Sequence, residues 1–251
     1  MKMSDTDRRY RVEFQDNLAI LWMNDGENRY NNESLTHLHE ALDTVVQNTK
    51  AEALITVGVG KFYSNGMDLN WLGQQDTKTL EVYYRLLHQL YIRILTFPMP
   101  TIAAINGHCY AAGGILALCH DFRIMRTKRG WFCLPEVHIN RPFKYPTRIL
   151  MRHKIPAGPL MRDIVILGKR YTSEELLPTG MLDGVTDESQ LLDDAKKLAV
   201  KAIGKDGYDR NILQKMKESV YEDVLEAFNY TTLQGHNLPQ HRGKLEPTSK
   251  L

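Results

Sequence analysis

Short apolar runs alternate along this sequence with longer segments in which apolar residues recur at helical spacing. The clearest runs cover residues 53–57, 101–105 and 122–125, and each has the length and composition of a buried strand. Strands that alternate with helices assemble into a sheet of parallel strands that is covered by the helices. The alternation therefore predicts an α/β fold with a largely parallel sheet.

The rest of the pattern adds a hairpin, a further strand and several helices. Residues 12–22 alternate in polarity about the polar turn Gln15-Asp16-Asn17, which indicates a hairpin. Residues 180–185 have strand-like spacing, and residues 172–175 fit a capping box before a short helix. Helices are predicted over residues 35–45, with Asn31 and Asn32 as cap candidates, and over residues 77–95, 112–119, 187–203 and 208–228.

The length of 251 residues suits one domain with an appended helical segment, or two small domains. The pattern divides the chain into a core over residues 1–186, a helical segment over residues 187–235 and a flexible tail over residues 236–251. The tail ends in Ser249-Lys250-Leu251, the terminal triplet that the peroxisomal import receptor reads as an address. We therefore expect the protein in the peroxisomal matrix, with that receptor as a partner.

The charge balance and the cysteines exclude several classes of protein. With 32 Lys and Arg against 30 Asp and Glu, the chain offers neither the basic stripe that nucleic acid requires nor a polybasic membrane segment. No apolar run approaches the roughly 18 residues of a membrane span. Cys109, Cys119 and Cys133 follow no metal-ligand spacing, so we expect buried thiols in a reducing compartment and no metal site.

Two junctions between a predicted strand and the segment after it are rich in glycine and small residues. They cover residues 61–69 and residues 106–115. Small residues at the start of a helix leave backbone N–H groups exposed. Each junction taken alone can be a tight turn that allows close helix packing. Together, on neighbouring strands, they can instead direct two N–H donors at one oxygen atom and form an oxyanion hole.

The two junctions resemble the two oxyanion loops of the crotonase (enoyl-CoA hydratase/isomerase) family. The Ser-Asn-Gly-Met-Asp-Leu sequence that ends at Leu69 is similar to the first loop, and residues 106–121 are similar to the second loop and the helix after it. The resemblance extends from about Val12 to the helices beyond Asp187. It implies a spiral of ββα units with a C-terminal helical layer used for trimer assembly. It also implies a homotrimer or a dimer of trimers, a coenzyme A thioester as substrate and no separate cofactor.

The resemblance also assigns residues to the site. The backbone N–H groups of Met67 and Ala112 correspond to the two oxyanion donors. Lys61 and Arg29 match positions near the phosphates of coenzyme A, although both can equally be ordinary exposed cations. The other residues expected to contact substrate or coenzyme A are Ser64, Asn65, Gly66, Asp68, Leu69 and Gly113.

The acid–base groups favour an isomerase over a hydratase. Hydratases of the family use two glutamates, and here the first position is Ile115 while the second is Glu136. One base is enough to move a double bond from C3 to C2, because it removes a proton from C2 and returns it to C4. Apolar neighbours such as Ile115 raise the pKa of a carboxyl group toward neutrality. We therefore expect similarity to the peroxisomal Δ3,Δ2-enoyl-CoA isomerases of fatty-acid β-oxidation.

The sequence departs from the family pattern after Glu136. Members continue with Leu-Gly or Ile-Gly and then a proline, whereas this chain reads Val-His-Ile-Asn-Arg-Pro. Arg141 either reaches the acyl pocket or points to solvent, and we favour solvent. We interpret His138 as a loop residue rather than a second base, and His108 and His120 as structural.

Two other functions stay open from the sequence. One is a hydratase or another crotonase-type lyase whose second acid comes from elsewhere. The other is a catalytically silent member that only binds acyl-CoA, and the retention of Glu136 argues against it.

Overall fold

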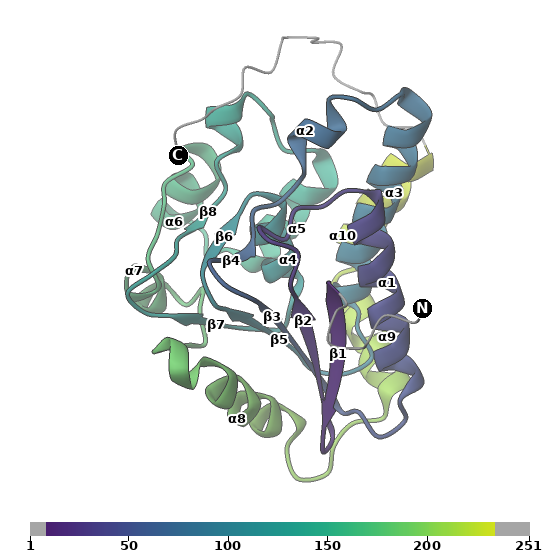
Figure 1. The fold of residues 1–251 in the computed structure, drawn as a ribbon, viewed down its shortest axis with the longest axis vertical. Helices are drawn as coiled ribbons and strands as arrows, with labels where there is room; N and C mark the ends of the chain where they lie inside the picture. Colours follow the sequence, from purple (N-terminus) through teal and green to yellow (C-terminus); the bar gives the residue numbers. More distant parts are fainter. Residues whose placement is uncertain (1–8, 234–251) are drawn as a thin grey trace.

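A six-stranded sheet forms the centre of the molecule, for which the computed structural model describes residues 9–233 (Figure 1). The strands lie in the order β1-β2-β3-β5-β7-β9, and all neighbours are parallel except the β1–β2 hairpin. The largely parallel sheet and the N-terminal hairpin are both confirmed. The strand bounds are β1 Tyr10–Gln15, β2 Leu18–Met23, β3 Ala53–Gly58, β5 Thr101–Ile105, β7 Phe122–Arg126 and β9 Gly184–Thr186.

A second, smaller sheet was not predicted from the sequence. It consists of the parallel strands β4 (Phe62–Ser64), β6 (His108–Tyr110) and β8 (Phe132–Cys133). Strands of two or three residues are too short to show the two-residue period of a strand. Each of them follows a strand of the large sheet, so the chain repeats the unit strand, short strand, helix. This repeat is the spiral of ββα units that the resemblance implied.

The helices agree with the predictions in most places. Asn31 and Thr172 cap their helices with reciprocal side-chain bonds, as capping boxes do. In the described part of the chain, no helix is long and apolar enough to cross a membrane. The bounds are α1 Asn32–Gln47, α2 Leu69–Leu72, α3 Thr77–Leu95, α4 Ala112–Cys119, α5 Tyr145–Lys154, α6 Pro159–Met161, α7 Ser173–Leu176, α8 Leu191–Ile203, α9 Arg210–Val220 and α10 Glu222–Leu233.

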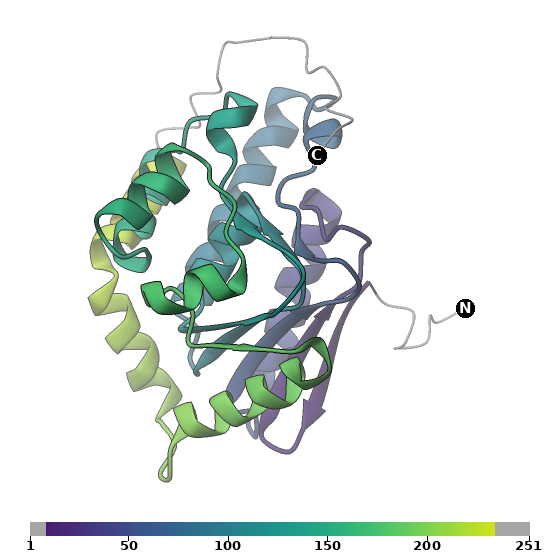
Figure 2. The ribbon, with the colours of Figure 1, turned by 90° about the vertical axis from the view of Figure 1, so that its left-hand side faces the viewer.

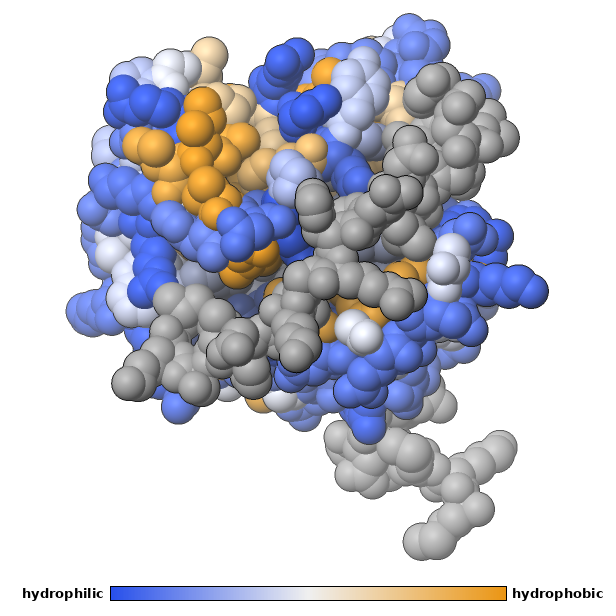
Figure 3. Space-filling model, turned by 90° about the horizontal axis from the view of Figure 1, so that it is seen from above, coloured by the Kyte–Doolittle hydropathy of each residue, from blue (hydrophilic) through white to orange (hydrophobic). Residues whose placement is uncertain are grey.

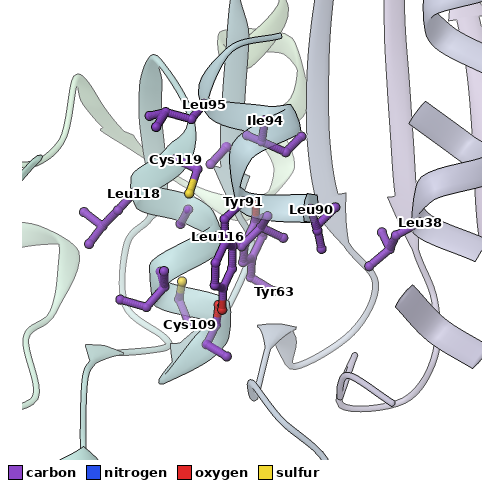
Figure 4. Close-up of a cluster of buried hydrophobic side chains, with 14 of the residues drawn as sticks. Leu38, Tyr63, Leu90, Tyr91, Ile94, Leu95, Cys109, Leu116, Leu118 and Cys119 are labelled. Carbon is purple, nitrogen blue, oxygen red and sulfur yellow. The ribbon is translucent and has the colours of Figure 1, made fainter. Parts of the chain in front are cut away.

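Helices cover both faces of the large sheet. Helix α8 packs against β3, β5 and β7, and it buries Leu191, Ala195 and Ala199 against apolar side chains of the strands. On the other side, α3 packs between α1 and α4. Figure 4 shows the interior there, where Tyr91 of α3 and Leu116 of α4 point into one cluster. Burial of these apolar surfaces supplies most of the stability of the fold.

The prediction of one helix over residues 208–228 is wrong, because the chain breaks at Tyr221 and forms α9 and α10. The break places the Tyr221 ring 4.5 Å from the ammonium group of Lys154, which also donates a 2.7 Å hydrogen bond to the Tyr221 hydroxyl. Lys154 belongs to α5, a helix that was not predicted and that packs along α10. In Figure 2 the chain runs from α8 at the bottom up the left side through α9 and α10.

Candidate active site

The carboxyl ends of the three short parallel strands lie at the same end of the small sheet. Parallel strands present their carboxyl ends together, and loops at such ends commonly form binding sites. The chain leads from β4 to Met67, from β6 to Ala112 and from β8 to Glu136. The small sheet therefore gathers the three residues that the sequence assigned to catalysis.

Ser64 fixes the first loop after β4. Its hydroxyl donates to the carbonyl oxygen of Asn28 at 2.8 Å and accepts from the N–H group of Gly66 at 3.1 Å. Gly66 has a φ of 78°, which favours glycine. The chain then bridges to Tyr30, whose N–H group bonds to Gly66 and whose carbonyl accepts from Asp68. In the described part of the chain, the intervening N–H group of Met67 has no acceptor.

Ala111 turns the chain from β6 into helix α4. Its φ of 49° with ψ of −125° is a strained conformation for a residue other than glycine, and such strain is common at functional sites. Its side chain makes no capping bond, so the first N–H groups of α4, including that of Ala112, are left for another acceptor. The Tyr91 hydroxyl donates to the Ala112 carbonyl oxygen at 3.2 Å and holds this turn in place.

Two glycines in α4 allow its first turn to lie close to both flanking loops. A Cβ atom on Gly113 would lie 2.6 Å from Ser64, and one on Gly114 would lie 2.9 Å from Leu134, just before Glu136. From the other side, a Cβ atom on Gly66 would lie 3.0 Å from the Ala112 nitrogen. The first loop, the start of α4 and the segment leading to Glu136 are thus in direct contact.

Glu136 is buried close to where these three segments meet, with only 7% of its surface exposed. Its Oε2 atom has no hydrogen-bond partner in the described part of the chain. Burial raises the pKa of Glu136 to about 7, and its own backbone N–H group opposes this weakly. A carboxyl group with that pKa can both accept and release a proton near neutral pH.

The chain matches known proteins over most of its length. The sequence profile described as enoyl-CoA hydratase/isomerase matches residues 13–242. This chain belongs to the enoyl-CoA hydratase/isomerase family. It is 30% identical to enoyl-CoA delta isomerase 3 of Arabidopsis thaliana over 219 residues, which cover 84% of this chain and 92% of the relative.

A second relative and a solved structure are also similar to this chain. Enoyl-CoA delta isomerase 2, peroxisomal, of Arabidopsis thaliana is 36% identical over 174 residues, which cover 66% of this chain and 72% of that protein. A probable enoyl-CoA hydratase of Mycobacterium tuberculosis has the same fold, with a TM-score of 0.81 at 22% identity over 90% of this chain and 93% of the other. The resemblance and the fold predicted from the sequence are confirmed.

Three residues that were assigned to ligand contact have structural partners in this family member. Asn65 donates from its side chain to Glu27 at 2.9 Å, and Asp68 caps α2 by accepting from the N–H group of Trp71. Leu69 begins α2 and packs against the core. Asn65 and Asp68 thus hold the shape of the first loop.

The two predicted cations lie at different places. Arg29 forms a 2.6 Å ion pair with Glu27, whose carboxylate also holds Asn65, so Arg29 lies beside the first loop. Lys61 directly precedes β4, so it lies at the opposite end of that strand from the first loop. Both side chains reach the surface, and Arg29 is the one that the structure ties to the site.

Asn28 is a structural residue of the site that was not predicted. It is fully buried with a φ of 51°, and its side-chain amide donates to the carbonyl oxygens of Met23, Phe62 and Tyr63. It thereby joins the end of β2 to β4. Its place in the polar turn Asn24-Asp25-Gly26-Glu27-Asn28 indicates a turn but not this long-range role.

The other candidates for a second acid are unsuitable or exposed. Ile115 is buried in the first turns of α4 and cannot transfer a proton. His138 is exposed and lies two residues beyond Glu136. His120 is fully buried and bonds to Thr56 and to the Leu116 carbonyl oxygen, and burial lowers its pKa to about 3. His120 is therefore structural, as predicted.

Two surface hollows lie apart from this site in the described part of the chain. No group of three or more His, Cys, Asp or Glu side chains suited to a metal occurs among the described residues. A hollow of about 420 Å³ lies at the start of α9, beside Asp209 and Arg210, and one of about 400 Å³ lies along Glu218 and Glu222. Neither is lined by Met67, Ala112 or Glu136.

Proposed function

We propose that this family member is a Δ3,Δ2-enoyl-CoA isomerase in which Glu136 is the only proton-transferring side chain. The observation that carries the proposal is the buried, unpaired Oε2 atom of Glu136. Glu136 follows β8, and the segment that leads to it from β8 contacts the start of α4 through Leu134. The Arabidopsis relatives named as enoyl-CoA delta isomerases support the same reaction class.

The proposed reaction needs one base and one anion-stabilising site. Glu136 removes a proton from C2 of a 3-enoyl thioester, and the electron pair of that C–H bond delocalises onto the thioester oxygen. The N–H groups of Met67 and Ala112 stabilise the resulting enolate, and the loss of one such donor typically slows a reaction roughly 10²–10³-fold. When the enolate collapses, the double bond forms between C2 and C3, and Glu136 returns the proton to C4.

Incubation with two separate thioesters tests this reaction against hydration. We expect 3-hexenoyl-CoA to yield 2-hexenoyl-CoA, while 2-hexenoyl-CoA gains little water, because Ile115 replaces the second glutamate of a hydratase. Chromatography with mass detection separates the isomer from the hydrated product. Hydration of 2-hexenoyl-CoA faster than isomerisation of 3-hexenoyl-CoA would show that the protein is a hydratase. Binding of both thioesters without turnover would show a silent member.

The coenzyme A thioester is the proposed substrate, and no separate cofactor enters the proposed reaction. The reaction moves a proton and a double bond within one molecule, so it needs neither an oxidant nor a group donor. We place Arg29 and Lys61 near the phosphates of coenzyme A. The pairing of Arg29 with Glu27 beside the first loop supports the first of these placements.

We propose a peroxisomal location and a role in fatty-acid β-oxidation. The 36% identical Arabidopsis relative is named as peroxisomal, whereas the 30% identical one carries no such name. Ser249, Lys250 and Leu251 lie outside the described residues, so their support comes from the sequence and from the way the import receptor reads a terminal Ser-Lys-Leu.

We also propose assembly into a trimer or a dimer of trimers. Val137, Ile166 and Leu167 are each more than half exposed. Gly168 lies against Val137 and His138, so these apolar side chains are neighbours beside the Glu136 turn. Figure 3 shows apolar side chains gathered among hydrophilic ones on the face that it displays. Exposed apolar clusters favour contact with another protein surface, and light scattering measures the number of subunits.

A further inference from the structure

Tyr83 carries a buried hydroxyl group without a partner. The residue is 0% exposed, and its hydroxyl makes no hydrogen bond in the described part of the chain. A buried polar group that lacks a partner destabilises a folded protein, so its retention calls for an explanation. One explanation is an acceptor that a bound ligand supplies.

The position of Tyr83 connects it with the proposed active site. Tyr83 lies two turns before Tyr91 on α3, about 12 Å along the helix axis. Tyr91 bonds to the carbonyl oxygen of Ala112, at the proposed oxyanion donor. Toward the N-terminus of α3, the Tyr83 ring lies 5.7 Å from the ring of Trp71 in α2, the helix that begins directly after the first loop. This face of α3 therefore extends from the oxyanion donor to the underside of α2.

Arg141 and Asp68 supply charge around the Tyr83 hydroxyl. Burial, above all, raises the pKa of Tyr83 well above its usual range, while the charge of Arg141 lowers it and that of Asp68 raises it. The hydroxyl therefore remains a donor. Asp68 is engaged in capping α2, whereas Arg141 forms no ion pair with any described residue. The backbone N–H group of Arg141 bonds to the Glu136 carbonyl oxygen at 3.0 Å, so the backbone of Arg141 lies beside the turn that carries Glu136.

We propose that Tyr83 and Arg141 form a polar end of the acyl-binding site, which recognises an acyl chain carrying an oxygen acceptor away from the thioester. The Tyr83 hydroxyl donates to that oxygen, and Arg141 adds positive charge. A hydroxyl or a carboxylate on the distal part of the chain has the required chemistry. This inference rests on the proposed function, because it takes an acyl-CoA as the ligand. It takes up the other alternative that the sequence left open for Arg141, in which its side chain reaches the acyl pocket.

Calorimetric binding of three saturated thioesters tests the inference without turnover. The probes are octanoyl-CoA, its ω-hydroxy derivative and its ω-carboxy derivative. The same three probes in the hexanoyl series shorten the distance between the thioester and the terminal oxygen. We expect the protein to bind an oxygen-bearing thioester about tenfold more tightly than the plain thioester of equal length. Preference for the hydroxy or for the carboxy derivative identifies which group the site accepts.

Two variants and one control locate the preference. Tyr83→Phe keeps the ring against Trp71 and should remove most of the tenfold preference, measured as the ratio of the affinities of the same variant for the oxygen-bearing and the plain thioester. Arg141→Leu should weaken binding of the carboxy derivative alone. Tyr10→Phe removes another buried hydroxyl without a partner, at the start of β1, and should leave the preference intact.

Equal binding of plain and oxygen-bearing thioesters by the unmodified protein would overturn the inference, as would a preference that persists in Tyr83→Phe. These results leave the isomerase proposal standing, since that proposal is measured by turnover of 3-hexenoyl-CoA. Failure to bind any of the thioesters would overturn both proposals.

Discussion

At the scale of single residues, Glu136 combines burial with an unpaired oxygen atom, and this combination suits a base that must also release its proton. The Glu136→Gln variant keeps the shape of the side chain but cannot accept a proton. We expect the rate of 3-hexenoyl-CoA isomerisation to fall by at least the roughly 10² that a positioned base supplies. Binding of octanoyl-CoA should change little. A loss of activity below about threefold would show that Glu136 is not the base.

The pKa of Glu136 predicts how activity depends on pH. Because burial raises this pKa to about 7, the carboxylate form that accepts the proton from C2 accumulates as the pH rises through 7. We expect kcat/KM for 3-hexenoyl-CoA to increase roughly tenfold per pH unit below 7 and to level off above it. A profile that is flat between about pH 5 and about pH 8 would contradict this assignment.

The raised pKa of Glu136 also predicts how the stability of the protein depends on pH. Its rise from 4.5 to about 7 means that the folded protein binds more protons than the unfolded chain between these values. The free energy of unfolding should therefore fall by about 3 kcal/mol as the pH rises through this window. Denaturant unfolding of the unmodified protein and of Glu136→Gln checks the prediction. The variant should lack this decrease, and parallel pH curves for the two proteins would contradict it.

At the scale of elements, close contact between α4 and β4 holds the two proposed oxyanion donors together. Gly113→Ala would place a methyl group 2.6 Å from Ser64, and such overpacking typically costs about 1–3 kcal/mol. We expect the variant to be less stable by that amount. Because α4 must shift, isomerase activity should fall more than the folded fraction does. Denaturant unfolding and kcat/KM measure the two effects.

Gly184→Ala is the matched control for this contact. A Cβ atom on Gly184 in β9 would lie 3.4 Å or more from Ile124, which is an ordinary contact. We expect its stability to stay within about 0.5 kcal/mol of the unmodified protein, with unchanged turnover. Equal effects of the two substitutions would mean that the contact between Gly113 and Ser64 does not position the donors.

At the scale of the whole molecule, the proposed address and the proposed catalyst are separate parts of the chain. Deleting Ser249, Lys250 and Leu251 should leave turnover unchanged, because the site is built from residues far from them in the sequence. In cells, the truncated protein should remain in the cytosol. Fluorescence microscopy checks this, and the last dozen residues fused to an inert reporter should carry that reporter into peroxisomes.

Cells used for this test must lack the full-length protein, which could otherwise carry truncated subunits into the peroxisome within a mixed oligomer. Import of the truncated protein in such cells would show that Ser-Lys-Leu is not the address. The isomerase proposal would be unaffected by that result.

The sequence alone determined the parts of this protein that depend on local pattern. The strands over residues 53–57 and 101–105 and the helix over residues 77–95 were predictable, because their apolar residues recur over several turns or strand positions. Glu136, Met67 and Ala112 were identified as candidates because their motifs resemble those of the family. The resemblance implied that these three residues share one site, but no local pattern shows which contacts bring them together.

Only the tertiary structure decided how the site is assembled. The short strands β4, β6 and β8 exist because they pair with one another, and pairing across long separations leaves no periodic signal in two or three residues. The burial that raises the pKa of Glu136, the three bonds from Asn28 and the unpaired hydroxyl of Tyr83 likewise depend on neighbours that are distant in sequence. The break at Tyr221 brings its side chain to Lys154 of α5, and a local helical pattern contains no information on such a contact.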